Sequence, residues 1–267
     1  MRNTRRAAVI LLAAVYAASL GASCLSQFDY ARQFRDCVTA APSRLHPLGT
    51  DELGRDALAR LIHATRVSLL LAPAAALLAT AIAAAVGGAA GYRGGVWETL
   101  AMKTTDVVLS LPWLFLLLIA RGWMPLSAPP WQTLVTTFLL LGVFGWAAPA
   151  RVICGAARAL RASDAVLQAK AYGCPPWRLA LVHVLPNLRS ILLAQFLILI
   201  PVFILAEGNL GVLGLGVGEP LPSWGNLLRD LVNVPEVVDR PWMLAPLVVF
   251  AVVTGCFYLL TSAGESV

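Results

Sequence analysis

Histidines and acidic groups are the side chains of this sequence whose chemistry could be catalytic. His46, His63 and His183 lie far apart in the sequence with no metal-ligand spacing between them, so we expect structural or interfacial roles for them. The sequence contains no nucleotide-binding G-x-x-x-x-G-K-(S/T) motif and no G-x-S-x-G or H-E-x-x-H motif. We therefore predict no catalytic residue, no cofactor and no metal site.

Two ionisable residues at the ends of apolar runs call for a choice between functional and structural roles. Glu207 follows the run 191–206. It could be a proton relay or line a translocation path, since acids near membrane depth often do. Its place at the end of the run favours a role in holding the loop that follows. Arg121 could likewise face a solute path, but a snorkelling residue at a span end is the interpretation we favour.

The stretch 161–187 is polar and basic, and it lies between two long apolar runs. Its pattern predicts a helix over 163–171, with Ser163 as N-cap and Asp164 at the positive end of the helix dipole. Gly173 is expected to take the left-handed conformation that ends this helix, before two prolines that prevent its continuation. A second helix is expected over 177–185, ending where Pro186 turns the chain. Such an element is suited to docking against another protein.

Long uncharged runs place the chain among integral membrane proteins, since 59% of its 267 residues are hydrophobic and 13% are charged. The net charge of +6 does not predict nucleic-acid binding, because the basic residues are not grouped with stacking aromatics. The first run follows three arginines and could be a cleaved signal peptide, but its length favours an uncleaved span. Six spans are expected, at residues 7–25, 68–92, 107–123, 134–148, 191–206 and 244–260.

Basic residues are concentrated in the loop 151–189. The positive-inside rule places this loop in the cytoplasm, and counting crossings from a cytoplasmic N-terminus gives the same side. The segment 27–66 is then outside and both ends are inside. Within it, Thr50 is expected to cap an amphipathic external helix over 50–64, whose apolar stripe is Leu53, Ala57, Leu61 and Ala64.

Four separated motifs resemble ABC-transporter permease subunits of the dipeptide, oligopeptide and nickel branch. The basic loop ends in H-V-L-P-N ten residues after Gly173, as in the "EAA" loop of that family, although Leu167 stands at the family's acidic position and Gln168 at its next alanine. The other matches are H-P-L-G-T-D-E-L-G-R-D from residue 46, G-Y-R-G-G from residue 91, and the segment from Glu207 to P-L-P-S-W-G, which ends at residue 225.

The resemblance implies an all-α permease subunit in the bacterial inner membrane that moves solute by alternating access. It implies four kinds of partner: a second related permease chain, ABC ATPase subunits, a periplasmic or lipid-anchored solute-binding protein, and membrane lipid. The residues it places in the ATPase-coupling loop are Ser163, Asp164, Leu167, Gln168, Ala169, Lys170, Ala171, Gly173, Trp177, Arg178, His183 and Pro186. The residues that it would turn toward the binding protein or the solute path are His46, Asp51, Arg55, Asp56, Glu207 and Trp224.

The expected organisation is an N-terminal part over 1–66, a five-span core over 67–262 and a short tail over 263–267. Two other functions stay open. An ion-coupled secondary transporter would need polar coupling groups at mid-membrane, which the apolar runs scarcely show. A non-transporting assembly subunit would not need a docking loop. The solute, whether peptide, nickel or another, is left open by the sequence.

Overall fold

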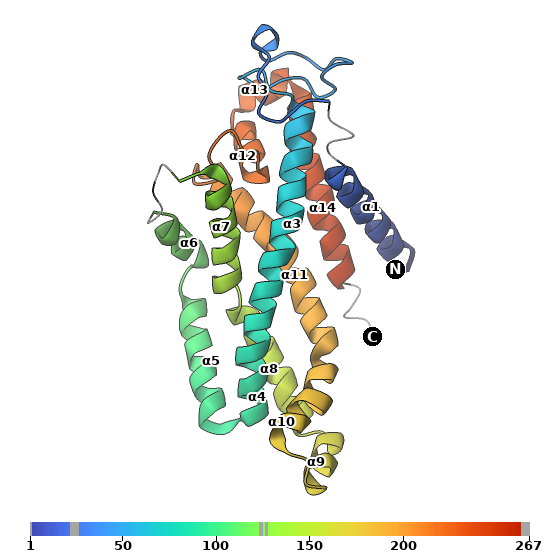
Figure 1. Ribbon diagram of the computed structural model, residues 1–267, viewed down its shortest axis with the longest axis vertical. Helices are drawn as coiled ribbons and strands as arrows, with labels where there is room; N and C mark the ends of the chain where they lie inside the picture. Colours follow the sequence, from blue (N-terminus) through green and yellow to red (C-terminus); the bar gives the residue numbers. More distant parts are fainter. Residues whose placement is uncertain (1, 22–26, 123–124, 126–127, 263–267) are drawn as a thin grey trace. The chain divides into compact units, whose positions relative to one another are not determined.

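The computed structural model describes residues 2–21, 27–122, 125 and 128–262 (Figure 1). The described residues form helices joined by turns, with no strand among them. Two isolated bridges pair Gln33 with Arg55 and Thr50 with Asp56. The predicted all-α class is therefore confirmed.

The chain divides into two compact units. The first comprises residues 1–72, 121–138 and 200–267, and the second comprises 73–120 and 139–199. The divisions fall within four helices, α3 (Ala57–Ala83), α6 (Trp113–Gly122), α7 (Pro130–Phe144) and α11 (Leu185–Val212). Each unit is described by itself below, and the consecutive domain boundaries expected from the sequence stay a prediction.

Four helical stretches are long and apolar enough to cross a membrane: Ala57–Arg93, Pro130–Arg161, Pro176–Val212 and Pro241–Thr261. They contain the predicted second, fourth, fifth and sixth spans. The predicted first span corresponds to α1 (Arg2–Leu20), and its residues 22–25 lie outside the described residues. Membrane-spanning helices are thus present, and a total of six spans stays a prediction.

The region of the predicted third span, 107–123, is divided between two helices. α5 (Gly95–Ser110) ends before Leu111, and α6 (Trp113–Gly122) begins after Pro112. Leu111 has an extended backbone, with φ −81° and ψ 129°. The proline ring disfavours the helical conformation for the residue before it, so Pro112 interrupts the helix instead of bending it.

Two of the apolar runs are embedded in helices longer than the runs themselves. α8 (Ala147–Arg161) follows α7 after a turn at Gly145 and Trp146, so the helical stretch that contains the predicted fourth span extends to Arg161. α3 passes through the π-helical segment η2 (Ala84–Gly88) into α4 (Ala89–Arg93). Hydropathy marks the apolar part of a helix only, whereas alanine and arginine continue the helix beyond it.

The predicted amphipathic helix over 50–64 is wrong at its start. α3 begins at Ala57, where the Asp56 carboxylate accepts a hydrogen bond from the Ala59 N–H at 2.7 Å. Thr50 caps no helix, because its hydroxyl accepts the N–H of Ala40 at 2.9 Å. Gly54 has φ +71°, which ends any helical path before residue 56. The apolar stripe expected of a separate external helix therefore belongs mostly to α3.

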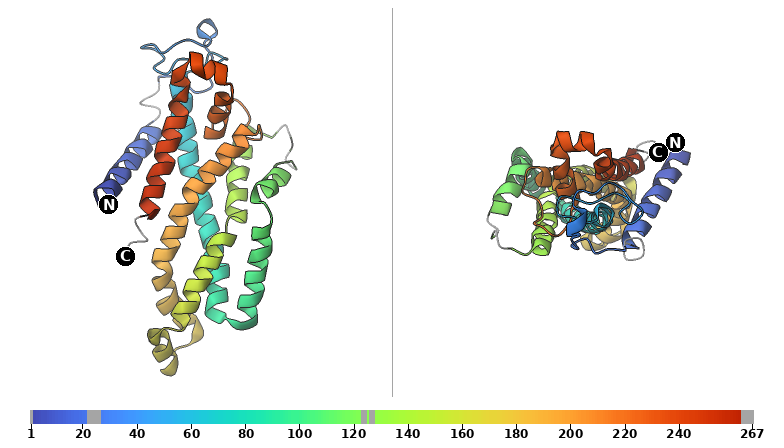
Figure 2. Two further views of the ribbon diagram at one scale, coloured as in Figure 1. Left: turned by 180° about the vertical axis from the view of Figure 1, so that it is seen from behind. Right: turned by 90° about the horizontal axis from the view of Figure 1, so that it is seen from above.

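In the first unit, α1 lies beside α14 (Ala245–Ser262), as both views of Figure 2 show. Trp224 begins the short helix α12 (Trp224–Arg229) and is fully buried. Its indole N–H donates to the Thr65 hydroxyl at 3.1 Å, and its ring meets the Phe250 ring edge-on at a centroid distance of 5.4 Å. A large aromatic residue thus fixes the loop after α11 against α3 and α14.

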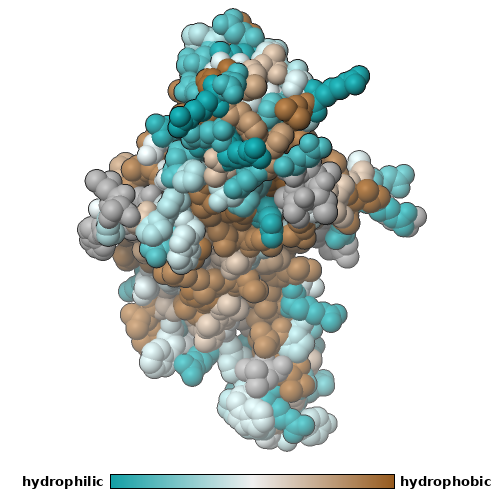
Figure 3. Space-filling view, turned by 45° about the horizontal axis from the view of Figure 1, so that its top comes forward, coloured by the Kyte–Doolittle hydropathy of each residue, from teal (hydrophilic) through white to brown (hydrophobic). Residues whose placement is uncertain are grey.

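In the second unit, small residues let two helices approach closely. A methyl group at Gly87 would collide with the Ala150 carbonyl, and one at Gly91 would collide with the Cys154 carbonyl. The i, i+4 spacing on both helices is the small-residue pattern that brings membrane helices together. Figure 3 shows the broad apolar surface, in brown, that helices of this composition leave outside.

Candidate functional site

The basic loop of the second unit contains the helix α9 (Asp164–Ala171). Gly173 follows with φ +79°, as predicted, and its N–H donates to the Lys170 carbonyl at 3.0 Å. The N–H of Cys174 donates to the Ala169 carbonyl at 3.1 Å. This pair of hydrogen bonds is a Schellman motif, which ends a helix with a residue of positive φ.

Ser163 stands at the N-cap of α9, but its side chain does not cap the helix. The hydroxyl instead donates back to the Leu160 carbonyl at 2.6 Å, at the end of α8. The predicted capping hydrogen bond is therefore wrong, although the predicted helix start is within one residue. Serine bonds to nearby backbone in both ways, so its presence did not decide between them.

The second helix of the loop does not end at Pro186. α10 (Pro176–Arg178) passes into the π-helical segment η3 (Leu179–Val184) and then into α11 without a break. Pro186 is the second residue of α11, where a missing N–H costs little because the π-helical turns before it already depart from the regular pattern. The expected turn at Pro186 is wrong.

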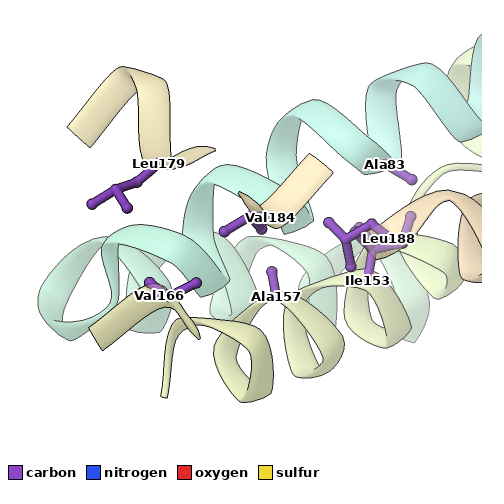
Figure 4. Close-up of a cluster of buried hydrophobic side chains, with 8 residues drawn as sticks. Ala83, Ile153, Ala157, Val166, Leu179, Val184 and Leu188 are labelled. Atoms are coloured by element: carbon purple, nitrogen blue, oxygen red, sulfur yellow. The ribbon is translucent and has the colours of Figure 1, made fainter. Parts of the chain in front are cut away.

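α9 is held in place by one buried face. Val166 belongs to a buried apolar cluster with Ile153, Ala157, Val184 and Leu188, whose side chains converge in Figure 4. Ala169 and Cys174, which the Schellman motif brings together, pack against the same cluster. Ala169 thus packs against this chain's own core, and its predicted part in ATPase coupling stays a prediction.

The other face of the loop is exposed and partly apolar. Leu167 is 51% exposed, Tyr172 is 91% exposed and Trp177 is 66% exposed. The remaining predicted coupling residues with exposed side chains are Asp164, Gln168, Lys170, Ala171, Arg178 and Pro186, and His183 is half-buried. The loop therefore presents three large apolar side chains among polar ones, on a backbone that is anchored from behind.

Tyr92 anchors the start of α10. Its hydroxyl donates to the Pro176 carbonyl at 2.8 Å, and the Tyr92 carbonyl accepts from the Arg161 guanidinium at 3.5 Å. The contact between Tyr92 and Pro176 joins a phenol hydroxyl to a backbone carbonyl, so the anchor is a neutral hydrogen bond rather than an ion pair. The loop is tied to the G-Y-R-G-G turn noted in the sequence.

Two ion pairs between α5 and α8 were not foreseen from the sequence. Arg158 pairs with Glu98 at 2.9 Å, and Arg151 pairs with Asp106. The spacing of these residues could have indicated the contact. Arg151 and Arg158 are seven residues apart and Glu98 and Asp106 are eight apart, so the two arginines share one helix face and the two acids share another. That these two faces meet is decided by the tertiary structure.

The motif from residue 46 forms a buried framework in the first unit. His46 Nδ1 lies 2.8 Å from an Asp56 carboxylate oxygen, and both side chains are only 4% exposed. Asp56 in turn caps α3 through Ala59. The pair thus fixes the beginning of α3. The prediction that His46 and Asp56 face a partner stays a prediction, and their buried side chains would act there only through the backbone they hold.

Two arginines and two carboxylates form a network in the same unit. Arg55 and Arg60 each pair with Asp51 and with Glu219, at distances that include 2.7 Å for Arg55–Asp51 and 3.1 Å for Arg60–Glu219. Burial by itself would raise the pKa of Asp51. Hydrogen bonds from Arg55 and the charge of Arg60 outweigh it and hold that pKa below its usual value. Arg60 and Glu219 were missed because they belong to segments far apart in sequence.

Glu207 lies in α11 and is 1% exposed. One carboxylate oxygen accepts the Gly225 N–H at 3.3 Å, while the other has no hydrogen-bond partner among the described residues. A methyl group at Gly211 would collide with the Gly225 backbone. Glu207 and the glycines thus hold the start of α12 against α11, which agrees with the interpretation that this acid fixes the following loop. The side chain of Arg121 lies outside what the structure describes.

A family model described as "binding-protein-dependent transport system inner membrane component" matches residues 79–263. The match covers more than half of the chain and includes the whole basic loop. The chain belongs to this family. The resemblance found in the sequence motifs is confirmed, and the inner-membrane component is a transport permease and not an enzyme.

Named relatives of this inner-membrane component are peptide permeases. The dipeptide transport system permease protein DppC of Bacillus subtilis is 33% identical over 82% of this chain and 66% of its own length. The oligopeptide transport system permease protein OppC of Escherichia coli K12 is 32% identical over 93% of this chain and 80% of its own length. OppC of Bacillus subtilis is 29% identical over 88% of this chain and 75% of its own length.

Proposed function

We propose that this chain is one permease subunit of an ATP-driven importer for peptides or a similar small solute. The observation that carries the proposal is the anchored loop with exposed Leu167, Tyr172 and Trp177. Clustered apolar and aromatic side chains on a rigid support are what a protein-docking site needs. The names of the DppC and OppC relatives support peptides as the solute class.

The partners in this proposal are ATPase subunits on the loop, a solute-binding protein on the opposite side of the membrane, and a second related permease chain. A homodimer is the alternative for the last. ATP binding would move the docked loop, and α11, which is continuous with the loop through η3, would carry the movement into the membrane. The solute path would then open alternately to the two sides.

The proposed topology has six spans in the bacterial inner membrane, with both ends and the loop in the cytoplasm and the segment 27–56 outside. Arginine enrichment around the loop supports this side. Single cysteines at positions 52 and 170, in a cysteine-free variant, would report the sides through an impermeant thiol reagent. Labelling of position 170 but not 52 in intact cells would overturn the topology.

Transport in proteoliposomes tests the function. The chain would be reconstituted with a partner permease, ATPase subunits and a solute-binding protein that co-purify with it, and uptake of a labelled dipeptide would be measured with and without ATP. Trp177→Ser should abolish ATPase co-purification and uptake, while Trp131→Ser, a change at a comparably exposed tryptophan in α7, should not. Uptake driven by an ion gradient without ATP would favour a secondary transporter, and no uptake by the complete complex would favour an assembly subunit.

A further inference from the structure

The first unit contains a partly open cavity of about 440 Å³ whose walls come from three places in the chain. They are the segment 48–60, the region from residue 219 to α13 (Val234–Asp239), and the residues that lead into α14. A volume of this size is within the ordinary range of small-molecule sites, about 300–1,000 Å³. The cavity is separate from the coupling loop, which belongs to the second unit.

The inner wall of the cavity is an almost neutral ion-pair layer. Arg55 and Arg60 are 4% and 2% exposed and are compensated by Asp51 and Glu219. The Nε donor of Arg60 nevertheless has no hydrogen-bond partner among the described residues. Because this Nε atom is closed off from solvent, the inner wall offers a ligand no free donor, and the charges open to a ligand belong to other lining residues.

Further charges of both signs line the cavity outside this ion-pair layer. Arg229 and Arg240 form no ion pair with any described residue, and neither do Glu52 and Asp230. Glu236 also lines the cavity and accepts a hydrogen bond from the Asn233 amide at 2.7 Å, so two guanidinium groups and three carboxylates lie outside the ion-pair layer. A ligand with a single charge would interact favourably only with the groups of opposite sign, whereas a ligand with both charges would interact with both kinds of group.

The remaining wall is apolar, formed by Leu48, Leu53, Leu227, Trp242, Met243 and Pro246. Apolar surface beside a few charged groups is the usual composition of a small-ligand site. We propose that this cavity binds a small zwitterion with an apolar side chain, such as a short peptide with free ends, within this single permease chain. The inference rests on the proposed function for its biological meaning, as a holding site for the transported solute.

Binding to the purified full-length chain in phosphatidylcholine nanodiscs tests the site without any partner. The probes for titration calorimetry are alanyl-leucine, its N-acetyl form, its amide, and N-acetyl-alanyl-leucine amide. We expect alanyl-leucine to bind best and each singly blocked form to bind about tenfold more weakly, the loss typical of one charged hydrogen bond. The doubly blocked form should show no measurable binding. Equal affinity for all four probes would overturn the proposal.

Variants locate the binding. Asp230→Asn and Arg240→Gln should each weaken alanyl-leucine about tenfold. Matched changes outside the cavity lining, Asp239→Asn and Arg35→Gln, should leave the affinity unchanged. Retained affinity in both cavity variants would also overturn the proposal. If the chain binds alanyl-leucine but supports no ATP-driven uptake, this inference stands and the proposed function fails. If both cavity variants support ATP-driven uptake with the same apparent affinity for alanyl-leucine as the parent, the proposed function stands and this inference fails.

Discussion

The hydroxyl of Tyr16 in α1 donates a hydrogen bond of 3.0 Å to the backbone carbonyl of Leu69 in α3. The regular helical partner of that carbonyl would be the N–H of residue 73, which is a proline and has none. In an apolar surrounding such a carbonyl must find another donor. Tyr16 supplies it, so the proline inside α3 and the tyrosine of α1 form one structural device.

Tyr16→Phe should therefore destabilise the protein, because it leaves the Leu69 carbonyl without a donor. We expect a loss of about 1 kcal/mol, since hydrogen bonds in membrane proteins contribute on the order of 0.6–1.7 kcal/mol. Pro73→Ala in the same background should restore most of it by supplying the missing N–H. Melting of the parent, both single variants and the double variant in detergent measures the coupling. Additive effects of the two changes would contradict this account.

Gly173→Val should separate coupling from stability. The position has open space around it, so only the positive φ opposes a side chain. The strain of about 1–2 kcal/mol for a β-branched residue would shift the Schellman motif and misplace the exposed residues around it. Expression should stay near normal while uptake falls, by up to about 100-fold if the loop moves by about 1 Å.

Gly173→Asn is the matched control for that change, because asparagine tolerates positive φ. It should retain most of the uptake. Normal transport by Gly173→Val, or a loss explained by failed membrane insertion, would mean that the geometry of this loop does not transmit coupling.

Leu167→Asp and Ala169→Asp should fail in different ways, although they lie two residues apart. Leu167 is exposed, so its variant should fold normally and lose ATPase co-purification. Ala169 packs against the buried cluster, so its variant should lower the melting temperature through an unpaired charge. Melting curves and co-purification on both variants check this. An unchanged melting temperature for Ala169→Asp would show that this face of α9 is not held by the cluster.

Gly211→Ala and Gly208→Ala test the approach of α11 to the loop after it. A methyl group at Gly211 would collide with the Gly225 backbone, whereas one at Gly208 would meet Leu228 and Phe250 at ordinary contact distances of 3.5 and 3.6 Å. Gly211→Ala should cost about 1–3 kcal/mol by overpacking, and Gly208→Ala should be near neutral. Equal stability of the two variants would contradict the close approach.

Asp230 predicts a pH-dependent contribution to stability. Part of the residue is open to solvent, yet burial of its carboxyl raises the pKa to about 6; Arg60 and Arg55 lower it, and Glu219 and Asp51 raise it. The folded protein thus holds a proton that the unfolded chain releases near pH 4, so the contribution of Asp230 becomes less favourable as the pH rises from about 4 through 6.

Asp230→Asn should consequently be more stable than the parent at pH 7.5, and its advantage should shrink at pH 5. Melting temperatures of both proteins at the two pH values measure this, with Asp239→Asn as the control. An advantage of the same size at both pH values would show that the Asp230 carboxyl is not raised by its surroundings.

The sequence by itself determined the helical class, the apolar stretches, the family and the local geometry around Gly173. These depend on signals between near neighbours in the chain: apolar run length, a glycine followed by prolines, and motif letters in order. Such signals failed where a residue can satisfy two local patterns, as at Thr50, which accepts from Ala40 instead of capping a helix, and at Ser163, which turns back to Leu160.

Only the tertiary structure decided which residues meet across long separations. Arg60 and Glu219 are 159 residues apart, and no pattern in the sequence around either residue predicts that they form an ion pair. Ala169 and Leu167 are both apolar residues of α9, yet Ala169 packs against the buried cluster that contains Val166 and Leu167 is exposed. The physical reason is that burial and ion pairing depend on what other segments bring to a surface, and an amphipathic pattern says which face is apolar but not what covers it.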